Sequence, residues 1–354
     1  ALPASLINPD PDTGQAQAAE FYNEDPTAAW IIPVTPECVT SPSDDYTGIR
    51  TLSNTLFPSY YVQEPRGLSN LAWGFVQLVM SDMFVLQTDS DLDPINIVLG
   101  PGYQNMSVLQ LETRSGINNT QNAWGCQEVP NAVTSILDAS WLYGDSTRAA
   151  QLRSGSRGQM SLSTGGNLPL ATSTTFLAGS DAVNENSLIA ALTTIFVLEH
   201  NRIANELYAL NPGWSDDLLF YKARSYVIVE YQTIVLQEMI PALFPSLPSS
   251  LPVFTDLVSS QVTLEFALTA SEFFRSMVNG AAYNWYTGNT VGNVTSVGVP
   301  NILWTAWTTH AERYDAHVAS MECNNTGTNI DYISRTLAWG QQVGLATYSQ
   351  IRAA

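Results

Sequence analysis

The sequence is poor in positive charge. It contains 13 lysine and arginine residues against 32 aspartates and glutamates, and its single lysine is Lys222. The formal net charge is therefore −19. Proteins that bind nucleic acid need clusters of basic side chains to neutralise phosphates, so nucleic acid is excluded as an expected partner. An acidic surface of this kind is compatible with solubility or with cation binding, and it does not predict a fold.

Long apolar runs are lacking as well. No stretch reaches the roughly eighteen consecutive apolar residues that a transmembrane helix requires. Hydrophobic residues nevertheless make up 45% of the chain, which is ample for a large core. The N-terminus, Ala1-Leu2-Pro3, has no initiator methionine and no signal sequence. We therefore expect a processed mature N-terminus and no membrane span.

Cysteine is scarce and odd in number, with only Cys38, Cys126 and Cys323. If two of them form a disulfide, the third is free or pairs with a second chain, so a homo-oligomer joined through an unpaired cysteine is one prediction. Four N-glycosylation motifs occur in polar stretches that favour surface loops, at Asn105, Asn118, Asn293 and Asn324. Together with the expected processed N-terminus, these motifs predict a secreted, extracellular glycoprotein.

Two long helical patterns meet at a short turn within residues 188–240. Apolar residues recur there at three- and four-residue steps, which is typical of amphipathic helices. Between the two patterns, Pro212 and Gly213 are expected to end the first helix, and Ser215 to cap the second. Both helices are too apolar to be stable alone, so we expect them in the middle of the core.

The rest of the chain predicts a mainly α protein. Residues 1–60 are rich in Pro, Asp and Thr and predict an extended arm packed on the core. Residues 61–354 are expected to form a single domain. Few runs alternate as strands do. Further helices are predicted within residues 66–88, 131–143, 144–152, 259–279 and 331–352, and loops over residues 89–130, 154–180 and 241–258.

Several ordered motifs carry a family resemblance. They are EHNRIANELYALNP from Glu199, YKAR from Tyr221, Thr113-Arg114-Ser115 and the tail from Gly344 to Arg352. In this order they resemble the animal haem peroxidases. The resemblance implies a mainly α, animal haem-peroxidase-like helical domain that is shortened at its C-terminus.

The resemblance also locates a haem pocket and shows what it lacks. A haem peroxidase needs a proximal histidine on iron, a distal histidine that moves a proton, and a distal arginine. The family's distal pattern WGQ--DHD aligns with residues 73–80, which places Val79 at the distal histidine, with Leu78 and Met80 in place of carboxylates. In the G-x-R--E pattern, Ala182 replaces the arginine and Glu185 is retained.

The proximal pattern F-TAAFRFGHSMV aligns with residues 266–278 and places Arg275 at the iron-ligating histidine. A guanidinium stays protonated and has no lone pair for iron. The asparagine that orients the family's proximal histidine falls at Thr336. These positions are therefore vestigial, and the sequence predicts no catalytic residue and no haem: Val79, Ala182, Glu185, Arg275 and Thr336.

The three histidines do not restore an iron site. His200 lies in the EHN motif, and we expect it to be a hydrogen-bonded core residue. His310 and His317 are seven residues apart and could share a helix face with Glu312 as metal ligands. The interpretation we prefer is that both are surface histidines, because no further ligand follows at helical spacing.

Among the functional features of the animal haem peroxidases, the calcium loop is the one that this sequence retains most completely. Residues 134–140 resemble the family's Thr-x-Phe-x-Asp-x-Ser loop. The candidate ligands are Thr134, Ile136, Asp138 and Ser140. Calcium prefers more than one carboxylate, and Met80 removes the second unless Asp82 substitutes for it. The alternative is a loop without metal, which keeps its shape because Asp138 caps the next helix.

Three functions remain open at this point. The first is a secreted, glycosylated, haem-free pseudo-peroxidase that serves as a binding scaffold. Its haem pocket would be either collapsed or occupied by an apolar ligand such as a lipid or a pigment. The second is a structural, calcium-binding component of an extracellular matrix. The third is a haem peroxidase with a non-standard iron ligand, for which Met80, His200 and Glu185 are the candidates.

Overall fold

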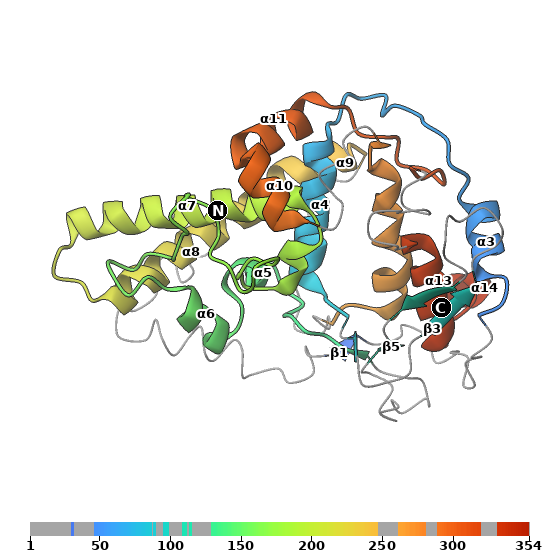
Figure 1. Ribbon diagram of the computed structural model, residues 1–354, viewed down its shortest axis with the longest axis horizontal. Coiled ribbons are helices and arrows are strands. Elements are labelled where there is room, and N and C mark those ends of the chain that lie inside the picture. The colour runs from blue at the N-terminus through green and yellow to red at the C-terminus, as the bar shows by residue number, and fades with distance from the viewer. Residues whose placement is uncertain are drawn as a thin grey trace.

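The computed structural model confirms the mainly α class (Figure 1). Strands occur only as three two-stranded antiparallel sheets within the described part of the chain. No helix of that part is both long and apolar enough to cross a membrane. The residues that the structure describes are 30–31, 46–86, 88–89, 95–98, 108–111, 113–114, 129–246, 261–280, 289–319 and 331–353.

The predicted pair of long helices is confirmed as α7, Ser187–Leu210, and α8, Asp216–Ile234. Figure 1 shows them side by side, projecting from the body of the molecule. Ser215 caps α8 as predicted, because its side chain accepts a hydrogen bond from the Leu218 amide at 3.2 Å. The chain continues from α8 through a π-helical stretch, Val235–Met239, into the short helix α9, Ile240–Leu243.

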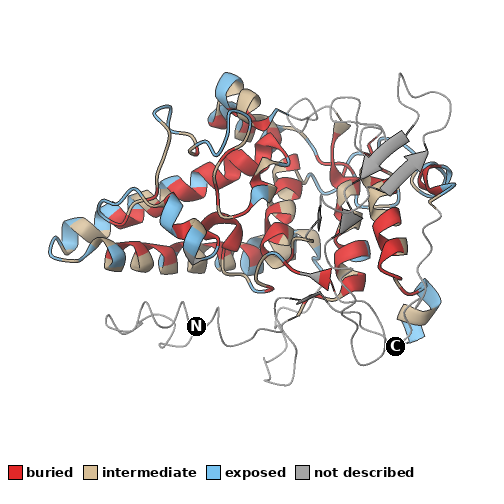
Figure 2. Ribbon diagram, turned by 60° about the horizontal axis from the view of Figure 1, so that its bottom comes forward, coloured by how far each residue is buried: buried red, intermediate tan, exposed pale blue. Residues whose placement is uncertain are grey.

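The core forms where α4, Asn70–Met83, packs against α7. At Gly74 an added Cβ would lie 2.3 Å from Leu188 Cδ2, so the contact of the two helices requires glycine there. Buried residues gather on the facing sides of the helices (Figure 2). At the centre, the Trp141 ring meets Phe196 at 5.2 Å and Tyr231 at 5.9 Å, both edge-to-face.

Short helices surround this core. Trp141 belongs to α5, Ser140–Tyr143, and Asp145 caps the next helix, α6, Ser146–Leu152. The helical prediction for residues 331–352, which left open one or two helices, is confirmed with two, α13, Tyr332–Gln342, and α14, Tyr348–Ala353. Helix α13 packs against α3, Ile49–Leu56, at the end of the molecule away from the α7–α8 turn (Figure 1). The expectation of an extended arm over residues 1–60 is therefore wrong for residues 49–56, which are helical.

The single helix expected over residues 259–279 is also wrong. The chain instead forms a π-helical stretch, Phe266–Ala270, followed by a 3₁₀ helix, Glu272–Met277. Two hydroxyl groups bond back to main-chain carbonyls, Thr269 Oγ1 to Glu265 at 2.5 Å and Ser271 Oγ to Ala267 at 2.8 Å. Side chains that occupy helix carbonyls in this way disturb regular α geometry.

Two expected loops contain regular structure. Asn293 lies half-buried in α10, Thr290–Val297, and not in a surface loop. This helix is followed by α11, Val299–Thr308. The stretch 89–130 contains β3, β4, β5, β6 and the end of β2, and the strands pair as β1 with β6, β2 with β5 and β3 with β4. Their bounds are Trp30–Ile31, Thr88–Asp89, Ile95–Val98, Val108–Leu111, Thr113–Arg114 and Val129–Pro130.

Some sequence predictions lie outside the described residues. They are the pairing of Cys38, Cys126 and Cys323 and the glycosylation motifs at Asn105, Asn118 and Asn324.

Candidate functional site

A cavity of about 140 Å³ lies where the resemblance locates the haem pocket. Helix α4 forms one wall, the turn Asp181–Asn184 a second, and the segment around Glu272 with α13 a third. Of the five vestigial positions, Ala182, Glu185 and Arg275 line the cavity. Sequence reasoning did not single out Arg335 or Trp339, which also line it.

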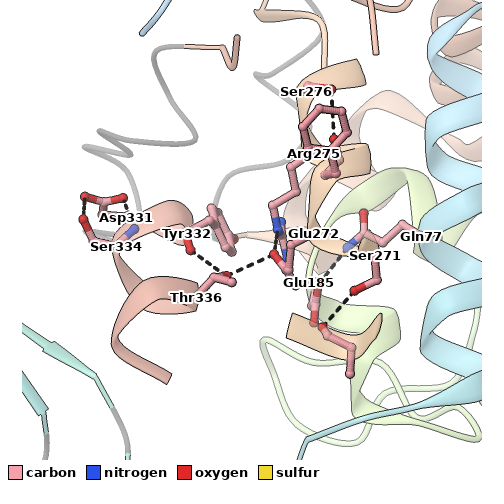
Figure 3. A network of polar contacts seen from close by, with 12 residues as sticks. Gln77, Glu185, Ser271, Glu272, Arg275, Ser276, Asp331, Tyr332, Ser334 and Thr336 are labelled. Atoms are coloured by element: carbon pink, nitrogen blue, oxygen red, sulfur yellow. Dashed lines mark hydrogen bonds and ion pairs between the residues drawn. The ribbon is translucent and has the colours of Figure 1, made fainter. Parts of the chain in front are cut away.

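The proximal side is closed by an ion pair. Arg275 Nε donates a hydrogen bond to Glu272 Oε2 at 2.5 Å, and Thr336 Oγ1 donates to the same oxygen at 3.2 Å (Figure 3). The Arg275 guanidinium also lies over the Tyr332 ring, 4.5 Å from its centroid. Thr336 thus lies near Arg275, and its hydroxyl is shared between Glu272 Oε2 at 3.2 Å and the Tyr332 carbonyl oxygen at 3.0 Å.

Electrostatics hold this pair in its charged form. Burial alone would raise the pKa of the Glu272 carboxyl. The positive charges of Arg275 and Arg335, together with hydrogen bonds from Arg275 and Thr336, outweigh burial and lower that pKa. The cluster is therefore an ionised Glu272 carboxylate that is paired with Arg275 and further stabilised by the positive charge of Arg335 at longer range.

The distal side requires a correction, because Val79 does not line the cavity. Its side chain is 2% exposed and packs in the core, whereas Gln77, Met80 and Ser81 face the cavity. The family pattern WGQ--DHD fits α4 when it is placed two residues later. Gln77 then matches the glutamine, Ser81 stands at the distal histidine, and Asp82 matches the last aspartate.

Polar contacts on the distal side join the side chains of Gln77, Glu185 and Asn186 to one another. Gln77 Nε2 donates to Glu185 Oε2 at 2.7 Å (Figure 3), and Asn186 Nδ2 donates to Gln77 Oε1 at 2.8 Å. Ser81 Oγ donates to the Gln77 carbonyl at 2.9 Å. Ala182 has no functional group. No described residue that lines the cavity is a histidine.

The predicted calcium loop brings its residues together, with Asp82 as the second carboxylate. Ser140 Oγ donates to Asp82 Oδ1 at 2.9 Å, and Thr134 Oγ1 donates to Asp138 Oδ1 at 2.9 Å. The Ser140 amide also donates to Asp138 Oδ1, at 3.0 Å. The Ile136 carbonyl accepts from the Asp138 amide at 2.9 Å.

Asp82 is fully buried, and burial is the main cause that raises the pKa of its carboxyl. The negative charge of Asp138 raises that pKa further. In the described part of the chain, no group of three or more His, Cys, Asp or Glu side chains forms a candidate metal site. A cation here would depend on two carboxylates supplemented by hydroxyl and carbonyl oxygens.

His200 is a core histidine, as predicted. Its Nδ1 lies 2.9 Å from the Tyr143 hydroxyl and its Nε2 lies 2.9 Å from the Gly158 carbonyl oxygen. Both ring nitrogens are thus engaged, and neither is left for iron. Burial lowers the pKa of His200 to about 4, so the ring is neutral at physiological pH.

His200 is expected to make the protein sensitive to acid. Its pKa is lower in the folded chain than in the unfolded chain, so its contribution to stability is present above pH 6.5 and is lost as pH falls towards 4. The loss is on the order of 3 kcal/mol. Urea denaturation between pH 7 and 4 should show the wild type losing more stability than the His200→Gln variant. Equal losses would contradict the neutral buried ring, and His317→Gln is the surface control.

The other two histidines do not share a helix face. Helix α11 ends at Thr308, and His310 is exposed just beyond it. His317 lies in an irregular segment with its Nδ1 3.0 Å from Asp315 Oδ1. The expectation of helical spacing is therefore wrong, and the two rings are surface histidines.

Comparison with known proteins agrees with the fold and the motifs. Peroxinectin A of Dictyostelium discoideum is 30% identical over 182 residues, covering 46% of this chain and 34% of the relative. A peroxidase of Drosophila melanogaster is 32% identical over 192 residues, covering 46% of this chain and 28% of the relative. The matched region thus spans about a third of the length of these relatives.

Solved structures show the same fold. Peroxidase A of Dictyostelium discoideum superposes with a TM-score of 0.75 at 20% identity, over 91% of this chain and 73% of that one. A fatty acid alpha-dioxygenase of Oryza sativa gives a TM-score of 0.66 at 16% identity, over 88% and 63%. The sequence profile described as animal haem peroxidase matches residues 38–353. The chain belongs to the animal haem peroxidase family.

Proposed function

We propose that this chain is a haem-free pseudoenzyme of its family, secreted and acting as a binding scaffold for an apolar ligand. One observation carries the proposal. At the position of the iron-ligating histidine stands Arg275, and its guanidinium is paired with Glu272. This group has no lone pair for iron. Displacing it would also leave the half-buried Glu272 carboxylate without its nearest cation.

The size of the cavity supports the same proposal. Its volume of about 140 Å³ is below the roughly 300–1,000 Å³ of pockets that enclose drug-sized ligands. The distal position holds Ser81, whose hydroxyl is bonded to the main chain. The residues that face this cavity therefore do not fit haem, and we derive no reaction step through it.

The absorption spectrum of the natural protein, purified without added haem, tests the proposal. We expect only the ultraviolet bands of tryptophan and tyrosine, before and after incubation with excess haem. A visible band without a Soret band would identify a bound pigment and support the scaffold role. A Soret band would contradict the proposal. It would favour an iron peroxidase that uses Met80 or Glu185, since both line the cavity and His200 has no free nitrogen.

Calcium binding is a second proposed property. Its support is the convergence of Asp82 and Asp138 with the hydroxyls of Thr134 and Ser140. Calcium takes six to eight oxygen ligands and favours more than one carboxylate, and the Ile136 carbonyl can add one oxygen. These residues fit the ion. A calcium-binding scaffold also suits the alternative role, a structural component of an extracellular matrix.

Secretion and glycosylation remain proposals that rest on the four sequence motifs. If they are correct, an enzyme that removes N-linked glycans will lower the mass of the natural protein. The Asn293→Gln variant should keep the wild-type glycan mass, because Asn293 is half-buried in α10, where the acceptor is poorly accessible. An unchanged mass after treatment would argue against a glycoprotein.

A further inference from the structure

Arg335 on α13 lines the cavity, and its guanidinium contacts two aromatic rings of the same helix. Its guanidinium lies over the Tyr332 ring at 4.7 Å and over the Trp339 ring at 4.6 Å. The two rings come from residues three before and four after it on the same helix, so all three side chains share one helix face. A planar guanidinium held by aromatic rings at its faces can donate hydrogen bonds only from its edge.

One donor of that edge, the Nε–H group, lacks a protein acceptor. The buried Nε–H of Arg335 has no hydrogen-bond partner, and in the described ranges no carboxylate lies within ion-pair distance of it. The nearby acids are already engaged. Glu272 is bonded by Arg275 and Thr336, and Glu185 is exposed and bonded by Gln77. A buried donor without an acceptor is unfavourable, so the edge is suited to a ligand that supplies one.

The rest of the cavity defines the body of that ligand. Its apolar walls include Trp73, Met80, Phe84 and Phe274. A volume of about 140 Å³ is close to that of an engineered apolar cavity of about 150 Å³ that holds benzene. The space therefore suits about one six-membered ring.

We infer that the remodelled pocket binds a compact carboxylic acid built on a single ring, with its carboxylate on the edge of Arg335 and its ring among the apolar walls. This inference rests on the proposed haem-free scaffold. A carboxylate is planar and matches a guanidinium edge with two parallel hydrogen bonds. It carries one negative charge, which Arg335 can balance. A doubly charged phosphate would be repelled more strongly by Glu272.

Binding of benzoate tests the inference, with benzyl alcohol as the neutral analogue of similar size. Trp73 and Trp339 line the cavity, so tryptophan fluorescence and calorimetry both report on it. We expect benzoate to bind more tightly than benzyl alcohol. Arg335→Met should weaken benzoate at least tenfold and change benzyl alcohol by less than twofold. The matched control is Arg313→Met, whose arginine side chain is 58% exposed and does not line this cavity.

Two further variants separate a lost contact from a lost fold. Arg335→Lys keeps the charge without the planar edge, and it should weaken benzoate less than Arg335→Met does. Ala182→Phe fills the cavity from the turn Asp181–Asn184 and should abolish binding of both compounds. Circular dichroism must show that each variant melts as a folded protein.

The failures of the two proposals are distinguishable. Absence of benzoate binding, or equal benzoate affinity in wild type and Arg335→Met, overturns the carboxylate site. Binding of benzyl alcohol without preference for benzoate also overturns it, while the apolar scaffold stands. A Soret band in the purified protein overturns the scaffold itself, whatever benzoate does.

Discussion

The Asp331→Ala variant is expected to lose about 3–5 kcal/mol of folding stability, the usual effect of removing one partner of a buried ion pair. Asp331 is 3% exposed and forms a salt bridge with Arg50, which is 7% exposed. The same carboxylate caps α13, since Oδ1 accepts a hydrogen bond from the Ser334 amide at 2.9 Å. Removing it costs the cap of α13 and takes from the buried Arg50 the carboxylate with which it forms this salt bridge.

Urea denaturation at pH 7, compared with a surface control, checks this prediction. Arg148 pairs with Asp181 at 3.0 Å, but the Asp181 side chain is 82% exposed. Asp181→Ala should therefore cost less than about 1 kcal/mol. The double variant Arg50→Met with Asp331→Ala should recover part of the loss, because no buried charge is left unpaired. If Asp331→Ala and Asp181→Ala cost the same, the buried pair is not stabilising the fold.

The Arg50–Asp331 salt bridge also affects the cavity, because α13 supplies residues to the cavity wall. Helix α3, which contains Arg50, packs on α13, and α13 supplies Thr336, Arg335 and Trp339 to the proximal side. Loosening α13 would thus disturb the partners of Glu272 and the two rings that hold Arg335. We expect a weaker benzoate affinity in Asp331→Ala even under conditions in which the variant remains folded.

The helical frame could be predicted from the sequence because local signals agreed with one another. Ser215 follows a Pro-Gly stop and precedes an apolar helical pattern, and it caps α8 as expected. The segment around Thr269 and Ser271 could not be predicted in the same way. Its apolar spacing is helical, yet the chain forms π and 3₁₀ geometry there. The hydroxyl bonds of Thr269 and Ser271 to main-chain carbonyls do not by themselves account for this, because Thr193 and Thr194 make the same bonds within the regular helix α7.

The distal register was misread for a related reason. Trp73-Gly74 copies the first two letters of the family pattern by chance, whereas Gln77 and Asp82 preserve its chemistry. Burial resolves the ambiguity, because a two-residue shift turns a helix by about 200° and exchanges the cavity face for the core face. Asp82 is fully buried and accepts hydrogen bonds from Ala139 and Ser140. These contacts determine the register of the family pattern on α4, which the sequence match alone did not determine.

The replaced residues on the two sides of the cavity form one coherent arrangement. On the proximal side, an arginine and a glutamate neutralise each other at 2.5 Å. On the distal side, a glutamine links Glu185 to Asn186. Most of the polar side chains around the cavity are thus bonded to one another, and the buried Nε of Arg335 is an exception.

Calcium is expected to stabilise the protein by about 4 kcal/mol when it is present at a thousandfold excess over its dissociation constant. The effect should depend on pH. Burial and the charge of Asp138 raise the pKa of Asp82, so the metal-free protein holds a proton that the unfolded chain releases. Its stability therefore falls as pH rises from the ordinary carboxyl pKa through the raised one. Calcium competes with that proton, so its stabilising effect should be larger at pH 8 than at pH 5.

Thermal melting with calcium or with a chelator, at both pH values, measures these effects. Asp138→Asn is the decisive variant, because it removes one carboxylate ligand and also the charge that raises the pKa of Asp82. It should lose most of the calcium-induced shift, yet lose less stability than the metal-free wild type as pH rises. Equal melting with calcium and with chelator at pH 8 would show that the loop binds no metal. The lower pH sensitivity of metal-free Asp138→Asn would still be expected then, because repulsion between the Asp138 carboxylate and the buried Asp82 carboxylate does not require the ion.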